Sequence, residues 1–300
     1  MTLSAEVRPR GPYSLRLTAA STDATRRWRE GVVAAAVQTD AGPELGAATQ
    51  RRDGSVVLRA QTEQGLAALR FALALDDDHS AFLRRFAADP LLRGPVRELR
   101  GLRPARTATV AHALLRAFCG QLIDSRRARA IEWSILRAAT PPLTRDGLHA
   151  PPTAVALARL APAELRARGL HARRAAALVR ICSALDPERL RASPTPAVVA
   201  RLTRERGLGA WSAGVVCLEG LGRYDHGLTG DLGLVKLLVA LRGRPVHADE
   251  TRELLAGYGE WAGLASIYLL KGFARGLIPL PPGRRTRREI AAVRFAPNGA

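Results

Sequence analysis

The sequence predicts an α+β protein in which a small mixed domain of strands and helices precedes a larger all-α domain. Residues 1–88 alternate between short strand-like and helix-forming segments, with turn signals between them. Residues 89–282 carry helical periodicity almost throughout. With 300 residues and 47% apolar composition, the chain can bury a sizeable core. Residues 283–300 are expected to form a basic, flexible tail.

In the N-terminal part, residues 13–17 and 55–59 are short strand-like segments, which predicts two strands. An Asp-Gly turn precedes the second of them. An acidic turn at residues 76–80 is typical of a helix start. The helices expected here cover residues 24–29, 63–73 and 81–87.

The second part predicts a series of amphipathic helices that end before Pro279, Pro281 and Pro282, since proline cannot continue a helix. No internal repeat typical of a solenoid is present. The expected helices cover residues 109–120, 125–139, 152–160, 162–168, 173–185, 196–205, 210–221, 232–241, 248–258 and 261–274.

The charge balance favours a polyanionic partner. Lys and Arg number 46 and Asp and Glu 27, so the formal net charge is +19. Only Lys236 and Lys271 are lysines, so part of this basicity can reflect coding bias. No apolar run reaches the roughly 18 residues that span a bilayer, and we expect a cytoplasmic protein that associates with the nucleoid through DNA, without membrane contact.

The histidines and cysteines predict no metal site, because none has zinc-ligand or iron–sulfur spacing. The three cysteines lie far apart in apolar surroundings and are expected to be reduced core residues. These residues are His79, His112, His149, His171, His226 and His247, and Cys119, Cys182 and Cys217.

A glycine-rich turn, Gly207-Leu208-Gly209-Ala210, separates two predicted helices. Small residues allow close backbone approach, and the free N–H groups of the helix that begins at Ala210 can meet a phosphate oxygen. The alternative is that Gly207 only ends one helix and the turn only joins two core helices. Taken alone, a single Gly-x-Gly favours that alternative.

Asp231 follows Gly230 and precedes an apolar helix, a position that favours an N-capping carboxylate and keeps it ionised. An anion at this point can stabilise a cationic sugar. The alternative, a purely structural cap, is the better interpretation for an isolated aspartate before a helix. The turn upstream favours the catalytic interpretation.

These motifs, together with Cys119-Gly120-Gln121-Leu122 and Tyr258-Gly259-Glu260-Trp261, resemble the helix-hairpin-helix (HhH-GPD) DNA glycosylases, and among them the 3-methyladenine DNA glycosylase II type. The resemblance covers roughly residues 89–280. It implies a DNA N-glycosylase that excises alkylated purines from duplex DNA in base-excision repair and leaves an abasic site. In that family the aspartate that matches Asp231 is catalytic.

The resemblance also assigns supporting residues. Relatives that cleave the DNA backbone carry a lysine at the position of Trp211, so this chain is expected to lack lyase activity. Leu122 matches the apolar wedge that fills the gap left by a flipped base, although an ordinary core leucine is an equal alternative. Expected base-pocket residues are Trp211, Trp261, Tyr258 and Tyr268, each of which could instead be buried in the core; expected DNA contacts are Gly207, Leu208, Gly209, Ala210, Gln121 and Leu122.

No organic cofactor is implied, but the hairpin carbonyls are expected to share a monovalent cation with a phosphate when DNA is bound. The expected partner is damaged double-stranded DNA, and we expect a monomer. Val215 and Ala262 depart from the family pattern, where relatives often carry an aromatic residue and an arginine. Two alternatives therefore stay open: a glycosylase for hypoxanthine or 8-oxoguanine, and a noncatalytic DNA-binding module of the helix-hairpin-helix type.

Overall fold

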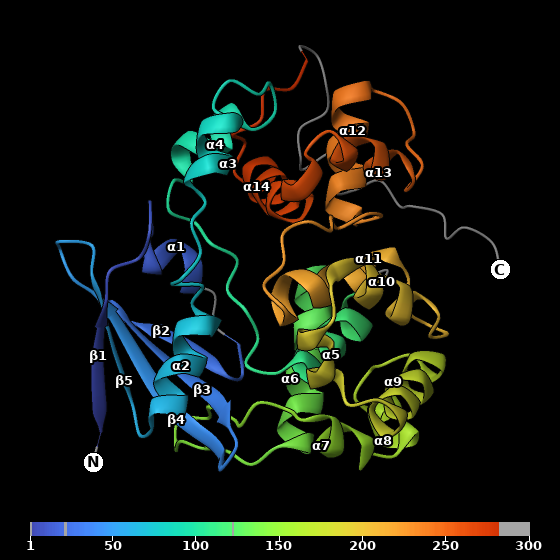
Figure 1. Ribbon diagram of the computed structural model, residues 1–300. Coiled ribbons are helices and arrows are strands. Elements are labelled where there is room, and N and C mark those ends of the chain that lie inside the picture. The colour runs from blue at the N-terminus through green and yellow to red at the C-terminus, as the bar shows by residue number, and fades with distance from the viewer. Residues whose placement is uncertain (1, 21–22, 122, 282–300) are drawn as a thin grey trace.

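The computed structural model describes residues 2–20, 23–121 and 123–281, so Leu122 and the predicted tail lie outside the described residues. An N-terminal antiparallel sheet is followed by helices, which confirms the α+β class (Figure 1). The strand order in the sheet is β1-β5-β4-β3-β2, with each neighbouring pair antiparallel. The strands are β1 (Leu3–Val7), β2 (Arg26–Arg29), β3 (Val32–Thr39), β4 (Gly42–Gln50) and β5 (Val56–Ala60).

Helices make up most of the remaining structure. The α-helices are α1 (Leu15–Ala19), α2 (Glu63–Ala72), α3 (Ser80–Arg85), α4 (Arg93–Glu98), α5 (Val110–Gly120), α6 (Ser125–Ala139), α7 (Ala154–Ala158), α8 (Pro162–Ala167), α9 (Ala172–Ala184), α10 (Thr195–Thr203), α11 (Ala210–Val215), α12 (Leu232–Arg242), α13 (Glu250–Ala256) and α14 (Ala262–Ala274). Two 3₁₀ helices, η1 (Pro187–Ala192) and η3 (Gly259–Trp261), and a π-helix, η2 (Val216–Gly220), complete the set.

Two N-terminal predictions are wrong. The strand expected at residues 13–17 is helix α1, because the Ser14 side chain accepts a hydrogen bond from the Leu17 amide at 3.2 Å and caps a helix. The helix expected at residues 24–29 contains strand β2, which pairs with β3. Tertiary pairing with β3 therefore overrides the local helix propensity of this segment.

Most other element predictions are confirmed. The predicted strand at residues 55–59 is β5, and the predicted helix at residues 63–73 is α2. The ten later helices are present with bounds shifted by a few residues. The predicted helix at residues 210–221 changes from α11 to the π-helix η2, and the short helix α4 was not expected.

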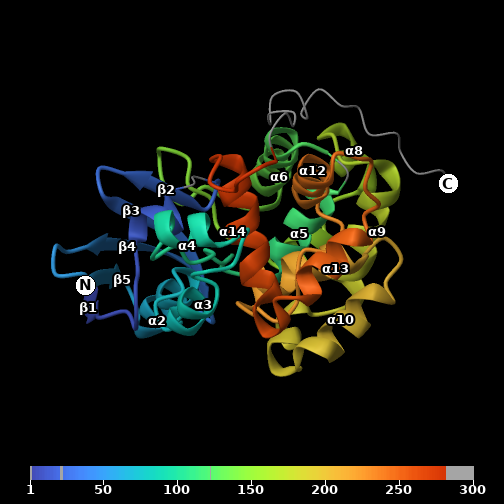
Figure 2. The ribbon, with the colours of Figure 1, turned by 90° about the horizontal axis from the view of Figure 1, so that it is seen from above.

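Three hydrophobic clusters hold the chain together. The first joins α5–α11, the second joins α3, α4 and α12–α14, and the third lies between the sheet and helices α1 and α2. Figures 1 and 2 show α3 and α4 next to α14. Within the second cluster the Phe82 ring of α3 lies 5.0 Å from the Tyr268 ring of α14, so α3 packs with the C-terminal helices. A division at residue 88 stays a prediction.

Arg116 connects the N-terminal region to the helices. Its guanidinium donates to Asp23 at 3.2 Å, to Glu132 at 2.9 Å and to Glu219 at 2.6 Å. Burial opposes the charge of Arg116, yet the three carboxylates raise its pKa well above the usual value. A second contact of this kind joins Arg106 to Asp77 and Tyr224. Ion pairs therefore join the N-terminal region to the later helices, in addition to the hydrophobic clusters.

Candidate active site

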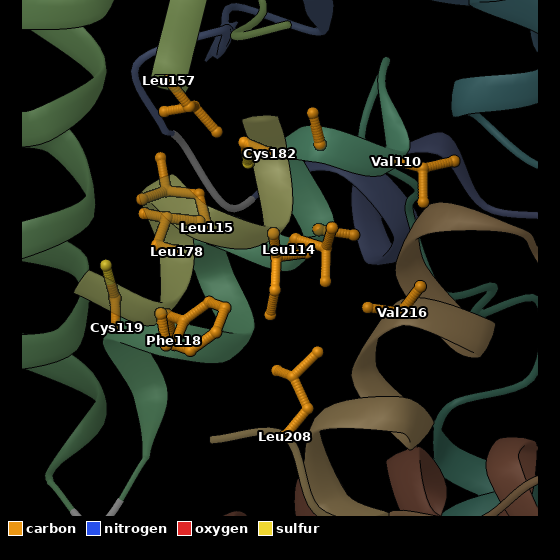
Figure 3. Packing of buried hydrophobic residues seen from close by; sticks show 14 of the residues in the cluster. Val110, Leu114, Leu115, Phe118, Cys119, Leu157, Leu178, Cys182, Leu208 and Val216 are labelled. Carbon is orange, nitrogen blue, oxygen red and sulfur yellow. The ribbon is translucent and has the colours of Figure 1, made fainter. Parts of the chain in front are cut away.

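Helices α10 and α11 form a hairpin whose turn contains the predicted glycines. Gly207 has φ of +101°, which L side chains rarely adopt, and a Cβ there would lie 3.3 Å from Ala177 Cβ. The Leu208 side chain is 5% exposed and points into the first cluster (Figure 3). Its amide donates to the Glu205 carbonyl at 3.0 Å. Leu208 therefore anchors the hairpin, and its side chain is not available to DNA.

The N-terminus of α11 has no side-chain cap and is sterically accessible. Gly209 is the N-cap and provides no side-chain cap, and a Cβ at Gly209 would meet no atom within 4 Å. The first N–H groups of a helix have no acceptor within the helix. The α11 N-terminus therefore presents uncapped backbone donors at a surface with room for a ligand.

Asp231 is the N-cap of α12, as its sequence position predicts. Its Oδ1 accepts hydrogen bonds from the Gly233 amide at 2.7 Å and the Leu234 amide at 3.4 Å. Gly230, with φ of +83°, donates to Thr251 Oγ1 at 2.7 Å. A Cβ at Gly233 would collide with Leu270 and lie 3.0 Å from Asp231 Oδ1. The two flanking glycines therefore allow the carboxylate to fold back onto the helix end.

Trp211 holds the other oxygen of this carboxylate. Its indole Nε1 donates to Asp231 Oδ2 at 2.9 Å. The ring packs against the end of α5, where a Cβ at Gly120 would lie 2.6 Å from Trp211 Cη2. Glycine at position 120 therefore makes room for the indole. Both carboxylate oxygens accept hydrogen bonds, which fixes the orientation of the Asp231 side chain.

Gln121 connects the end of α5 to the hairpin. Its side-chain amide donates to the Gly207 carbonyl at 2.8 Å and to Ser212 Oγ at 3.0 Å. Its own carbonyl accepts a hydrogen bond from Arg174 at 2.7 Å. The donor group of Gln121 is thus engaged within the protein, and this contact positions the turn relative to α5 and α9.

The site therefore combines three elements. A half-buried carboxylate with a fixed orientation lies at the start of α12, the indole of Trp211 contacts it, and Trp211 is the second residue of the helix with free N-terminal amides. Such an arrangement can place an anion close to a sugar whose phosphate is held at α11. Among the described residues no group of three or more His, Cys, Asp or Glu side chains could hold a metal ion.

Comparison with known proteins identifies relatives, although no family model matches the chain. A DNA-3-methyladenine glycosylase of Bacillus subtilis is 26% identical over 204 residues, 65% of this chain and 67% of that protein. The Mycobacterium tuberculosis protein named "Probable bifunctional transcriptional activator/DNA repair enzyme AlkA" is 28% identical over 224 residues, 71% of this chain. The chain spans 43% of that relative's length.

Solved structures have the same fold. A 3-methyladenine DNA-glycosylase from Archaeoglobus fulgidus superimposes with a TM-score of 0.79 at 20% identity, over 90% of this chain and 98% of that one. In sequence and fold the chain is therefore similar to DNA glycosylases of the 3-methyladenine type. A second solved structure with this fold, an 8-oxoguanine glycosylase/lyase of Clostridium acetobutylicum solved with double-stranded DNA, has a TM-score of 0.74 at 18% identity, over 91% of this chain and 98% of that one.

Two of the four aromatic residues expected in a glycosylase base pocket lie in the core. Tyr268 is fully buried, and its hydroxyl donates to the carbonyls of Leu99 and Leu102. Tyr258 is 5% exposed and packs edge-on against Phe86. The expectation that these tyrosines form pocket walls is wrong, because both rings pack inside the second cluster.

The two tryptophans differ from these tyrosines. Trp211 and Trp261 are half-buried and pack against the second cluster, so each retains accessible ring surface. The Trp261 ring lies 5.9 Å from Phe82 and 6.4 Å from the buried His79. The sequence analysis did not identify Gly120, which makes room for the Trp211 indole, or Gly233, which makes room for Leu270 and the Asp231 carboxylate. The signal in the sequence was a glycine within each motif.

Proposed function

We propose that the chain is a monofunctional DNA N-glycosylase that removes alkylated purines of the 3-methyladenine type by hydrolysis. The observation that carries the proposal is the Asp231 carboxylate, fixed by two α12 amides and by the Trp211 indole next to the hairpin. The relatives named DNA-3-methyladenine glycosylase and AlkA support the lesion class. Base-excision repair is the corresponding process.

Asp231 stabilises the positive charge that develops on the sugar as the N-glycosidic bond breaks. A carboxylate with a fixed orientation needs little reorganisation when that charge appears, so its electrostatic contribution is large. The same group can orient the water that attacks the sugar. The Trp211 hydrogen bond leaves Oδ2 with a free lone pair for either contact.

The DNA backbone is held at the hairpin. The amides of Gly209 and Ala210 bind a phosphate oxygen at the uncapped α11 N-terminus. Gly207 allows the turn, and Gln121 fixes it. The Gly207 carbonyl accepts a hydrogen bond from Gln121 and retains a second lone pair, so the expected monovalent cation fits there; it would orient the phosphate, and no catalytic step depends on it.

Excision proceeds without backbone cleavage, because Trp211 occupies the position where lyase members carry a lysine. The two lysines lie on other helices, Lys236 on α12 and Lys271 on α14. The half-buried Trp211 and Trp261 provide aromatic surface for a flipped purine, and an electron-rich ring favours a base made cationic by alkylation.

Base release from methylated duplex DNA tests this function. We expect release of 3-methyladenine and strand breaks only after alkali, and loss of both in Asp231→Asn with duplex affinity changed by only a small factor. Asp186→Asn is the matched control, because Asp186 also caps a helix by accepting an amide, that of Glu188, at 3.1 Å. Excision by Asp231→Asn at the wild-type rate would refute the catalytic assignment.

A panel of duplexes with hypoxanthine and 8-oxoguanine runs in parallel. Preferential release of either base would replace the alkylated-purine proposal. Strand breaks before alkali would contradict the monofunctional mechanism. Duplex binding with no base release from any substrate would favour the noncatalytic alternative.

A further inference from the structure

A large groove lies between α3, α4 and the chain that follows α14, apart from Asp231 and the hairpin. Its volume is about 1070 Å³. None of its lining residues belongs to α10, α11 or α12. The lining residues are Pro12, Ser80, Leu83, Arg84, Ala87, Arg93, Gly94, Val96, Arg97, Arg100, Gly276, Leu277 and Pro279.

Close helix packing fixes the shape of this groove. A Cβ at Gly94 would collide with the Leu277 carbonyl, and a Cβ at Gly272 would collide with Pro95. Helix α4 therefore lies directly on α14 and on the segment that follows it. The backbone that carries the groove residues is held by these contacts and does not need a ligand to organise it.

The charge of the groove is entirely positive. Arg84, Arg93, Arg97 and Arg100 line it and are exposed, and no lining residue is acidic. Two neighbouring carboxylates act on these arginines: Glu98 accepts a hydrogen bond from Arg97 Nε at 2.9 Å, and Asp78 interacts electrostatically with Arg84. Arg93 and Arg97 lie one helical turn apart, an interval of about 5–6 Å between Cβ atoms.

We propose that this groove binds the phosphodiester backbone of duplex DNA as a second contact surface, in addition to the hairpin. Four exposed arginines along one groove match a polymer with regularly repeated negative charges. The apolar floor of Leu83 and Val96 supports arginine stems, while the absence of aromatic lining residues gives no platform for stacked bases of a single strand. The contact is therefore with phosphates and is independent of sequence.

This inference rests on the proposed function only in taking DNA as the partner. Contact with DNA outside the lesion site would hold the protein on undamaged duplex between lesions. Binding at the groove would therefore raise affinity for any duplex without altering the excision step at Asp231.

The test compares Arg93→Gln/Arg100→Gln with the control Arg52→Gln/Arg59→Gln, which removes two exposed charges from the sheet region. Affinity for an undamaged fluorescent duplex is measured over a salt series. Each lost phosphate contact lowers the slope of log K against log salt by about 0.9, so we expect the groove variant to lose about 2 in slope and about tenfold to sixtyfold in affinity at roughly 0.1 M salt. The control should change much less.

The single-turnover rate of base release at saturating protein should stay within about twofold of wild type in both variants, and circular dichroism verifies folding. Equal losses of affinity in the two variants, or no loss in either, would overturn the groove proposal and leave the proposed function intact. Poly-glutamate that binds wild type but not the groove variant, without any change in duplex affinity, would instead identify an acidic protein partner. Absence of base release by wild type would count against the proposed function alone.

Discussion

The hydrogen bond from Trp211 to Asp231 predicts that Trp211→Phe lowers the rate of base release while keeping an aromatic ring in place. Phenylalanine fits beside Gly120 but has no N–H, so Asp231 Oδ2 loses its donor. A hydrogen bond to a charged group contributes about 1.5–3 kcal/mol. One tenfold change in rate corresponds to about 1.4 kcal/mol, so we expect a loss of roughly tenfold to a hundredfold.

The assay is single-turnover release of 3-methyladenine at saturating protein. Trp133→Phe is the control, because the indole Nε1 of Trp133 has no hydrogen-bond partner among the described residues. The double variant Trp211→Phe/Asp231→Asn should be no slower than Asp231→Asn alone, since Trp211 acts through that carboxylate. A rate within twofold of wild type for Trp211→Phe, or equal losses in the two tryptophan variants, would refute this reasoning.

Two further predictions concern the turn and a buried histidine. Gly207→Ala should lower the free energy of unfolding by about 1–2 kcal/mol, because φ at this residue is +101°. Gly209→Ala should mainly weaken duplex binding, since the added methyl group projects into open space. Urea unfolding and duplex titration distinguish the two effects, and the reverse pattern would contradict the phosphate site. Burial lowers the pKa of His79 to about 4; the positive charges of Arg103 and Arg106 add to this shift, and the negative charge of Asp77 opposes it. The unfolded chain therefore binds the proton more tightly than the folded chain between about pH 6.5 and pH 4, so the free energy of unfolding should fall by about 2 kcal/mol from pH 7 to pH 5. In urea unfolding, His79→Gln should lose most of this pH dependence. An unchanged pH dependence in His79→Gln would contradict the role of His79.

Most helices could be predicted because their signals are local. Thr109, Asp124 and Asp231 are side-chain caps that can be recognised in the sequence, and each caps its helix in the structure. The N-terminal errors have a different origin, since β2 depends on its pairing with β3 and α1 depends on one Ser14 cap. Pairing partners are not evident from the residues of one strand.

The candidate site was predictable in its residues and not in its contacts. The motif around Asp231 predicted an N-capping carboxylate, and the resemblance selected it. The bond from Trp211 to that carboxylate joins residues 20 positions apart, and the bond from Gln121 to Gly207 joins residues 86 apart. Contacts at such separations follow from helix packing, which no local pattern encodes.

The ion pairs of Arg116 connect the segment before the N-terminal strand β2 to the helices that carry the candidate site. Asp23 comes from the segment before β2, Glu132 from α6 and Glu219 from η2, the helix that continues from the hairpin. A truncated chain without the sheet would lose Asp23 and leave Arg116 with two carboxylates in place of three, so the sheet is better regarded as a foundation of the candidate site than as a detachable accessory.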